Sequence, residues 1–316
     1  LPPKRFPMST IASVSLDRPL EDIARDLGES FAEYGFAIVR DHGVPEELIA
    51  RAEEASRAFF AMPEETKRAY KIEGIGGARG YTPFGQEQAK DAEVFDLKEF
   101  WHVGRDLPAD HPLAQFMEPN VWPAEVPEYE ATMRELYLAL EASGRRVLSA
   151  IAIHLGEAPR FFDPAIEDGN SVLRLLRYPP LPEDAPDGAI RAAPHGDINA
   201  ITMLLGAEEA GLELLTKKDE WLAVSPPPGA LAVNIGDMLE RLTNGRLRST
   251  THRVVNPRGD AVRRARYSMP FFLHFRPDYL IDPLPSCIAQ GEEASAPEPI
   301  LAHDFLMQRL REIKLA

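Results

Sequence analysis

The sequence predicts a mainly β fold with flanking helices, and two observations support this prediction. In the first half of the 316-residue chain, apolar residues recur three or four positions apart, which is the spacing of amphipathic helices. After about residue 170, short apolar runs are separated by Pro, Gly, Asn and Asp, a pattern typical of a β-sandwich or β-barrel. We therefore expect a mixed α/β region at residues 1–125, and a helix, a β core and a closing helix at residues 126–316.

The first of these regions is expected to mix strands and helices. Its apolar patterns predict, in order, a strand at 9–16, a helix at 20–34, a strand at 36–39, a helix at 45–60 and a loop at 74–92. Gly35 supplies a stop for the first helix, and Pro45 is suited to open the second.

The second region is expected to begin with a long helix at 126–155 that has a break near Gly144. The β core then follows as apolar runs at 171–177, 197–205, 211–215, 221–224, 229–235, 252–256 and 263–275. The proline-rich segment 179–194 is expected to be a connection, because a central strand does not tolerate so many prolines. Residues 303–314 are expected to form the closing helix.

The composition excludes several classes of function. A formal charge of -15 argues against nucleic acid or an anionic membrane as the main partner, because both repel surplus negative charge. Cys287 is the only cysteine, so the chain can form neither an intrachain disulfide nor a cysteine-based zinc site. No apolar run approaches the length of a membrane span or of a signal peptide. These features fit a cytoplasmic enzyme of unspecified activity, and they leave its oligomeric state open.

A His-x-Asp motif is the sharpest local feature. His195 and Asp197 are two residues apart, so on an extended strand their side chains point to the same face. His252, at the head of another apolar run, offers a third ligand. Two histidines and one carboxylate on one face of a metal leave the other positions open, as oxygen-activating Fe(II) requires. Taken alone, however, a His-x-Asp tripeptide is frequent by chance, and a lone histidine at a strand end is more often simply hydrogen-bonded.

A second constellation lies further along the chain. Alternation places Arg266 and Ser268 on one face of the last long strand, opposite an apolar face. A buried arginine needs an anion, and a guanidinium beside a hydroxyl can hold a carboxylate at two points. The alternatives are an arginine on an edge strand or a structural ion pair. Tyr178, at the end of the run 171–177, either adds a phenol to the same carboxylate or only packs there.

Together these residues resemble the isopenicillin N synthase-like branch of the iron(II)/2-oxoglutarate-dependent oxygenases. The segments that carry the resemblance are 30–49, 80–81, 96–99, 175–180, 195–197, 234–238, 243–245, 252 and 266–268. The resemblance implies a distorted double-stranded β-helix (jelly roll) core buttressed by helices, after an N-terminal region of the non-haem dioxygenase type. It also implies a hairpin over 234–245, before the distal histidine.

The resemblance further implies a role for each candidate residue. His195, Asp197 and His252 match the Fe(II) ligands, and Arg266 and Ser268 match the pair that holds the far carboxylate of 2-oxoglutarate, with Tyr178 beside them. The implied reaction uses dioxygen, releases succinate and carbon dioxide, and hydroxylates or otherwise oxidises a small-molecule substrate.

Two other functions remain open at this point. An isopenicillin N synthase-like oxidase would use dioxygen without 2-oxoglutarate, and the stretch 175–180 is nearer to that form. Against it, residues 313–316 lack the glutamine that can ligate iron in that enzyme, and Gln308 falls inside the expected closing helix. The third function is a jelly-roll sensor that binds metal without catalysis.

The substrate side is less well determined. The loop 74–88, residues 100–102, and Phe272 or His274 are expected to line it, with the segment 179–194 and the closing helix as possible lids. Arg79 is by default a solvated loop arginine, and alternatively a contact for an anionic substrate. Because both ligand histidines must be neutral to bind iron, iron affinity is expected to fall below a pH of about 6.5.

Overall fold

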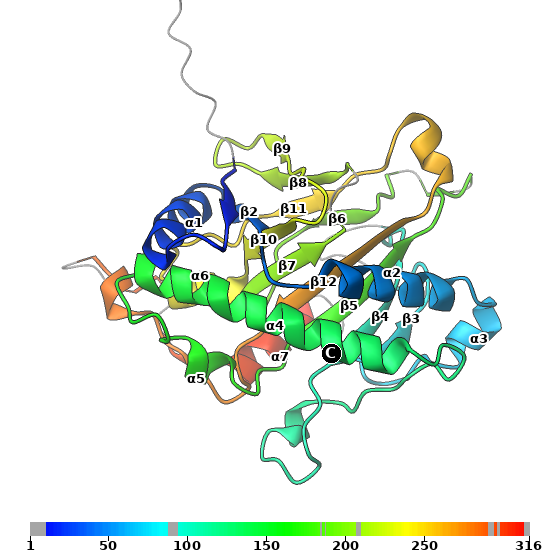
Figure 1. The fold of residues 1–316 in the computed structure, drawn as a ribbon, viewed down its shortest axis with the longest axis horizontal. Helices are drawn as coiled ribbons and strands as arrows, with labels where there is room; N and C mark the ends of the chain where they lie inside the picture. The colour runs from blue at the N-terminus through cyan, green and yellow to red at the C-terminus, as the bar shows by residue number, and fades with distance from the viewer. Residues whose placement is uncertain are drawn as a thin grey trace, which may run out of the picture.

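The computed structural model describes residues 11–87, 94–183, 185–186, 188–206, 210–289, 294–295 and 298–312. Two β-sheets lie one above the other, and helices cover the outer side of the larger sheet (Figure 1). The prediction of a mainly β fold with flanking helices is confirmed, and the arrangement is that of a jelly-roll core.

The larger sheet has eight strands, and both regions of the chain contribute to it. In spatial order they are β1 (Ser13–Ser15), β2 (Phe36–Arg40), β10 (Leu231–Ile235), β7 (Ile201–Leu205), β12 (Arg266–Leu273), β5 (Val172–Tyr178), β4 (Glu99–Gly104) and β3 (Gly80–Thr82). Strands β1 and β2 are parallel, whereas the other neighbours pair antiparallel. Strands from residues 1–125 thus extend both edges of a sheet whose centre comes from the second region.

The smaller sheet has four strands and lies above the larger one in Figure 1. Its order is β6 (Ala192–His195), β11 (His252–Val254), β8 (Leu212–Leu215) and β9 (Trp221–Ala223). An apolar cluster that includes Phe36 and Ala232 from the larger sheet, with Leu212 and Leu214 from the smaller one, holds the two layers together. A two-stranded sheet pairs β13 (Leu280–Ile281) with β14 (Ile300–Leu301).

The longer helices match the predictions at 20–34, 45–60, 126–155 and the described part of 303–314, whereas three short helices were not predicted. They are α1 (Leu20–Tyr34), α2 (Glu46–Phe60), α3 (Glu64–Arg68), α4 (Tyr129–His154), α5 (Asp163–Ile166), α6 (Asp237–Leu242) and α7 (Ala302–Glu312), with 3₁₀ turns at Ala114–Phe116, Gly259–Arg263 and Pro285–Cys287. Gly35 ends α1 in a left-handed conformation, as expected. Helix α4 packs against β7 and β12, and α1 and α2 lie beside it (Figure 1).

The expected break near Gly144 is wrong, because α4 is continuous through it. A Cβ atom at this position would lie 2.5 Å from Leu273 Cδ1 and 2.9 Å from Met203 Cε. The glycine therefore allows α4 to approach the larger sheet closely. Its cost in helix propensity is outweighed by the tertiary packing.

Three other boundaries differ from the predictions. The connection expected at 179–194 ends in strand β6, and the strand expected at 197–205 begins only at Ile201. Strand β6 can contain Pro194 because it lies at the edge of the smaller sheet, where a missing N–H is tolerated. In place of the hairpin expected over 234–245, α6 follows β10. Parts of the expected strand at 9–16, loop at 74–92 and helix at 303–314 lie outside the described residues.

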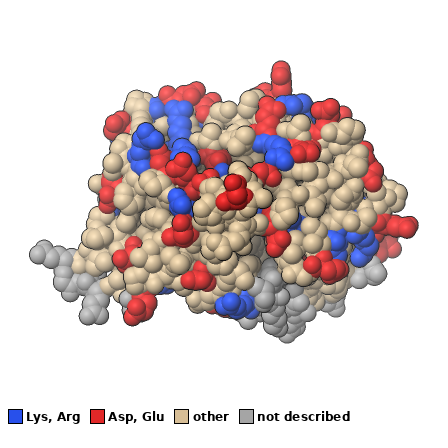
Figure 2. Space-filling model, turned by 90° about the horizontal axis from the view of Figure 1, so that it is seen from below, with Lys and Arg blue, Asp and Glu red and all other residues tan. Residues whose placement is uncertain are grey.

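Within the described residues, no helix is both long and apolar enough to cross a bilayer. On the face shown in Figure 2, lysine and arginine side chains are interspersed with acidic ones rather than gathered into one patch.

Candidate metal centre and adjoining cavities

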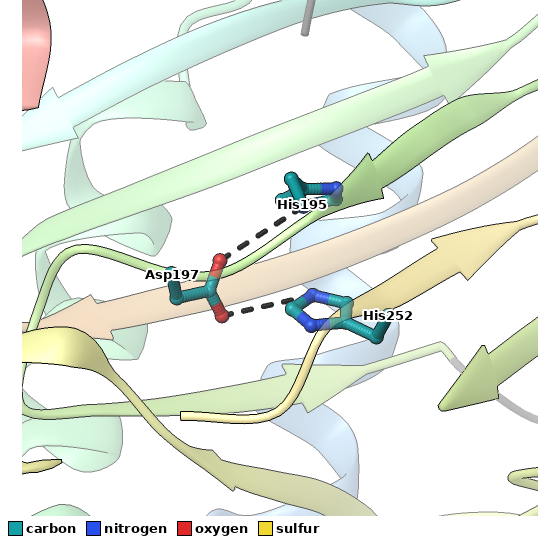
Figure 3. Close-up of side chains that lie close together, drawn as sticks. All are labelled: His195, Asp197 and His252. Carbon is teal, nitrogen blue, oxygen red and sulfur yellow. Dashed lines mark ion pairs between the residues drawn. The ribbon is translucent and has the colours of Figure 1, made fainter. Parts of the chain in front are cut away.

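His195, Asp197 and His252 lie together between the two sheets (Figure 3). His195 Nε2 lies 4.0 Å from Asp197 Oδ1, and His252 Nε2 lies 3.8 Å from Asp197 Oδ2. One ligand atom from each residue can be chosen so that all three lie within 4.8 Å of one another. The three side chains that the sequence singled out are therefore close enough to share one metal ion.

Strand pairing explains how the two histidines meet. His195 is the last residue of β6 and His252 the first of β11, and they lie directly opposite each other in the antiparallel register. Asp197 follows in the connection to β7, so the expectation that one strand presents both His195 and Asp197 is wrong. The strand ends at the first ligand, and the carboxylate reaches the site from the turn beyond it.

Backbone carbonyls fix the orientation of both imidazoles. His195 Nδ1 lies 2.7 Å from the Ala193 carbonyl oxygen, and His252 Nδ1 lies 3.1 Å from that of Thr250. A carbonyl can only accept, so each Nδ1 carries the proton and donates it. Each Nε2 therefore keeps its lone pair and could bind a metal, as metal-binding histidines commonly donate their other ring N–H to a carbonyl.

Two polar residues that the sequence analysis did not single out as site residues orient Asp197. Thr202 Oγ1 and Asn234 Nδ2 donate to Asp197 Oδ2 at 2.6 Å and 2.7 Å. Thr202 on β7 and Asn234 on β10 are register partners in the larger sheet. The available signal was a polar side chain inside an otherwise apolar strand, which in a buried sheet needs a partner. These bonds leave Oδ1 as the less engaged oxygen.

The electrostatics of the cluster suit a divalent cation. Burial, together with the neighbouring His252, lowers the pKa of His195 to about 4. Burial alone would raise the pKa of Asp197, but the two imidazoles and the bonds from Asn234 and Thr202 outweigh it, so this pKa is lowered. His195 is thus neutral and Asp197 ionised at neutral pH, as an Fe(II) ligand set requires. If His195 binds iron, protons would compete with the metal at this residue near pH 4 rather than near the expected pH of about 6.5.

The metal-free protein is expected to lose stability as the pH falls from 7 toward 4. Burial also lowers the pKa of His274 to about 4, so between that pH and about 6.5 the unfolded chain binds protons at His195 and His274 that the folded chain does not. Melting temperatures at pH 7, 6 and 5 test this. The decrease should be shallower in His274→Phe, and parallel curves for the two proteins would contradict the assignment.

A small cavity of about 60 Å³ is lined by His195, Asp197 and His252 and also by Arg266, Ser268 and Tyr178. Arg266 on β12 and Tyr178 on β5 are register partners, and the guanidinium carbon lies 5.2 Å from the Tyr178 ring centre. Arg266 is only 1% exposed, and Nη2 donates to the Gly206 carbonyl over a long 3.4 Å. Its Nε has no hydrogen-bond partner in the part of the chain that the structure describes, nor does any carboxylate there pair with it. A buried cation in this state is suited to receive an anion.

A larger cavity of about 520 Å³ adjoins the other side of the metal cluster. Phe100, His102, Phe272 and His274 line it as expected, together with residues 74–79 of the glycine-rich loop that was expected at 74–88. Trp101 does not, because the alternation of β4 points it into the helix-packed core, where it is fully buried. From the closing helix α7, Leu306 and Leu310 line the cavity, and Arg309 anchors the helix through a 2.8 Å ion pair with Asp237.

Known proteins share both the sequence pattern and this fold. Residues 7–125 match the family described as non-haem dioxygenase in morphine synthesis N-terminal, and residues 169–275 match the 2OG-Fe(II) oxygenase superfamily. The 2-oxoglutarate-Fe(II) type oxidoreductase hxnY of Emericella nidulans is 36% identical over 293 residues, which cover 90% of this chain and 82% of that protein. The chain belongs to the 2OG-Fe(II) oxygenase superfamily.

Solved structures of related proteins show the same architecture. The crystal structure of a 2OG-Fe(II) oxygenase family protein from Caulobacter crescentus is 51% identical, with a TM-score of 0.90 over 97% of this chain and all of that one. A full-length Neurospora crassa protein, crystallised in complex with alpha-KG and thymine, is 27% identical, with a TM-score of 0.84 over 95% of this chain and 96% of that one.

As a 2OG-Fe(II) oxygenase, the protein is a dioxygenase that uses Fe(II), 2-oxoglutarate and dioxygen to oxidise a small-molecule substrate, releasing succinate and carbon dioxide. The two alternatives, an oxidase independent of 2-oxoglutarate and a sensor without catalysis, are not favoured. Gln308 agrees with this, since it is exposed on α7 and bonds to Glu312, whereas Leu306 and Leu310 of the same helix line the cavity.

Proposed function

We propose that His195, Asp197 and His252 bind the Fe(II), and that Arg266, Ser268 and Tyr178 bind the far carboxylate of 2-oxoglutarate. The observation that carries the proposal is the buried Arg266, whose Nε has no partner among the described residues and which lies in a small cavity reaching the three ligand side chains. A five-carbon keto acid has its chelating end and its far carboxylate at opposite ends, so it needs both a metal site and a separate cation, and one cavity is lined by both.

When bound, Fe(II) activates dioxygen, and 2-oxoglutarate supplies electrons as it loses carbon dioxide and becomes succinate. The chain's own residues orient the metal-binding carboxylate and exclude water from the substrate. Thr202 and Asn234 hold the Asp197 carboxylate through Oδ2, so Oδ1 would be left for the metal. Phe272 lines both cavities, and Leu306 with Leu310 covers the larger one, so apolar side chains limit access of bulk water to the substrate.

The binding assignment is tested by adding 2-oxoglutarate to the protein loaded with Fe(II) under anaerobic conditions. Chelation of the keto acid should produce a weak visible charge-transfer band that saturates with cosubstrate. Succinate is analogous in its far carboxylate but lacks the keto group, so it should compete without producing a band. If 2-oxoglutarate gave no band and bound no more tightly than glutarate, the proposed cosubstrate pocket would be wrong.

A further inference from the structure

Apart from Asp197, whose charge the proposed Fe(II) would balance, the charged side chains that line the 520 Å³ cavity are paired, with one exception among the described residues. Those side chains are Lys71, Glu73, Arg79, Glu87, Arg174 and Asp197. Lys71 pairs with Glu73 at 2.7 Å, and Arg174 with Glu87 at 3.3 Å. Asp197 faces the two ligand histidines. For Arg79 there is no carboxylate at ion-pair distance in the described ranges.

Arg79 is not the solvated loop arginine that is the default for a glycine-rich segment. It is only 3% exposed, and its Nη1 donates a hydrogen bond to the neighbouring Ala78 carbonyl oxygen at 2.7 Å. Nε and Nη2 are buried and have no partner in the part of the chain that the structure covers. Burial lowers the pKa of the guanidinium, and Tyr137, Glu118 and Asp106 oppose this only in part. A buried cation with two idle donors is costly unless something else binds it.

The absence of a side chain at Gly104 makes room for the guanidinium. A Cβ atom on Gly104 would lie 1.9 Å from both Cζ and Nη2 of Arg79, so the guanidinium lies flat on this glycine. Gly104 and His102 share the inner face of β4, and they pair with Val172 and Arg174 of β5. Arg79 therefore lies one inward-facing row beyond Arg174, on the side away from Arg266.

Arg174 adds a second cation to the same wall. Its Nε donates to His102 Nε2 at 2.6 Å, and His102 Nδ1 donates to the Gly77 carbonyl oxygen at 2.6 Å. Burial, with the charge of Arg174, keeps the pKa of His102 well below its usual value, so His102 is neutral and cancels no charge. The guanidinium of Arg174 also lies 4.2 Å from the centre of the Phe100 ring and 5.2 Å from that of Phe272. The wall thus combines aromatic surface with one unbalanced positive charge.

We propose that Arg79 receives a carboxylate of the substrate, so that the enzyme acts on small organic acids with an apolar or aromatic body. This inference rests on the proposed function and names the substrate class of the same site. The two idle donors, Nε–H and Nη2–H, are parallel and form the edge of a guanidinium that grips a carboxylate at both oxygens. A single unbalanced charge matches a monoanion. The apolar body would lie against Phe100, Phe272, Leu306 and Leu310.

The test compares simple acids with their neutral amides. The protein is loaded with Zn(II) and saturating 2-oxoglutarate, which fills the cosubstrate pocket and prevents turnover. Benzoate, phenylacetate, 3-phenylpropanoate and pentanoate, each beside its primary amide, are then titrated by calorimetry. At least one acid should bind about tenfold or more tightly than its amide, since a charge-assisted pair is lost in the amide. If no acid binds more tightly than its amide, the proposal is wrong.

Two variants and a control test whether Arg79 causes the preference for an acid over its amide. Arg79→Met removes the charge and should abolish the acid-over-amide preference, whereas Lys71→Met should keep it, because that cation is already paired with Glu73. Gly104→Ala serves as the second variant if Arg79→Met fails to fold, since it keeps the charge but displaces the guanidinium. A preference that persists in whichever of these variants folds would overturn the proposal.

Failure of this inference can be told apart from failure of the cosubstrate assignment. If the acids lose binding in Arg266→Ala but keep it in Arg79→Met, they occupy the cosubstrate pocket and the proposal for Arg79 is wrong. The 2-oxoglutarate charge-transfer band should be present in Arg79→Met. Its absence in the unsubstituted protein would count against the cosubstrate pocket instead.

Discussion

Replacing Asp197 with alanine is expected to lower the affinity for Fe(II) by more than about 100-fold. Loss of a residue that merely hydrogen-bonds to a metal ligand already lowers metal affinity or activity by about 10- to 100-fold. Asp197 is the only carboxylate in the cluster, and without it two neutral imidazoles would have to hold a divalent cation. Succinate production should fall below detection. The measurements are Fe(II) content after anaerobic dialysis against a competing chelator, and succinate formed per enzyme.

The matched control for this substitution is His111→Ala. His111 is a partly exposed histidine whose Nε2 lies 3.5 Å from Asp168 Oδ2. It lines neither cavity. It should retain Fe(II) and turnover. Circular dichroism must show that the Asp197→Ala protein is folded. A folded Asp197→Ala protein that bound Fe(II) as tightly as the unsubstituted one would exclude the three-residue ligand set.

Replacing Arg266 with alanine is expected to raise the KM for 2-oxoglutarate by about 30- to several thousand-fold, because removing one partner of a buried charge pair costs about 2–5 kcal/mol. The loss should fall mainly on cosubstrate binding. Arg266 lines the small cavity but is not one of the three clustered metal-site residues, so kcat at saturating 2-oxoglutarate should change much less. Arg266→Lys should recover only part of the affinity, since a lysine cannot reproduce a two-point contact.

Steady-state succinate formation at varied 2-oxoglutarate separates these two parameters. Arg264→Ala is the control, because Arg264 precedes the same strand but is exposed and lies outside both cavities. It should leave the KM for 2-oxoglutarate unchanged. An Arg266→Ala protein with an ordinary KM and a reduced kcat would place the far carboxylate elsewhere.

The chemistry of the site could be predicted from side-chain type and spacing, but the secondary structure that positions these side chains could not. His195 and Asp197 are neighbours in space, as their two-residue separation predicts. They do not share a strand, because β6 ends at His195. Where a strand ends depends on which backbone groups find partners in the next strand, and that pairing is a property of the fold rather than of the segment.

Alternation was a reliable guide in β12, where both residues lie within one strand. It placed Arg266 and Ser268 on the inner face of β12, and both line the small cavity. Residues 100–102 were instead grouped as one substrate-side segment, although the same rule separates Trp101 from its neighbours. Trp101 indeed packs against Phe59 of α2.

Contacts between distant segments could not be predicted from one sequence. Arg79 can be buried because its guanidinium packs against a glycine of β4, Gly104, and no local pattern links the two positions. The same holds for Thr202 and Asn234, whose common partner Asp197 becomes evident only once β7 and β10 pair. Gly144 is a further case, because its neighbours Leu273 and Met203 belong to strands far along the chain.

The ligand set draws on both layers of the sandwich. The two histidines belong to the smaller sheet, whereas the carboxylate is fastened to the larger one through Thr202 and Asn234. A metal bound by all three residues would therefore cross-link the two sheets. The free energy of metal binding would then add to the free energy of unfolding. Loss of iron would weaken the packing of the two sheets at the site as well as abolish the reaction.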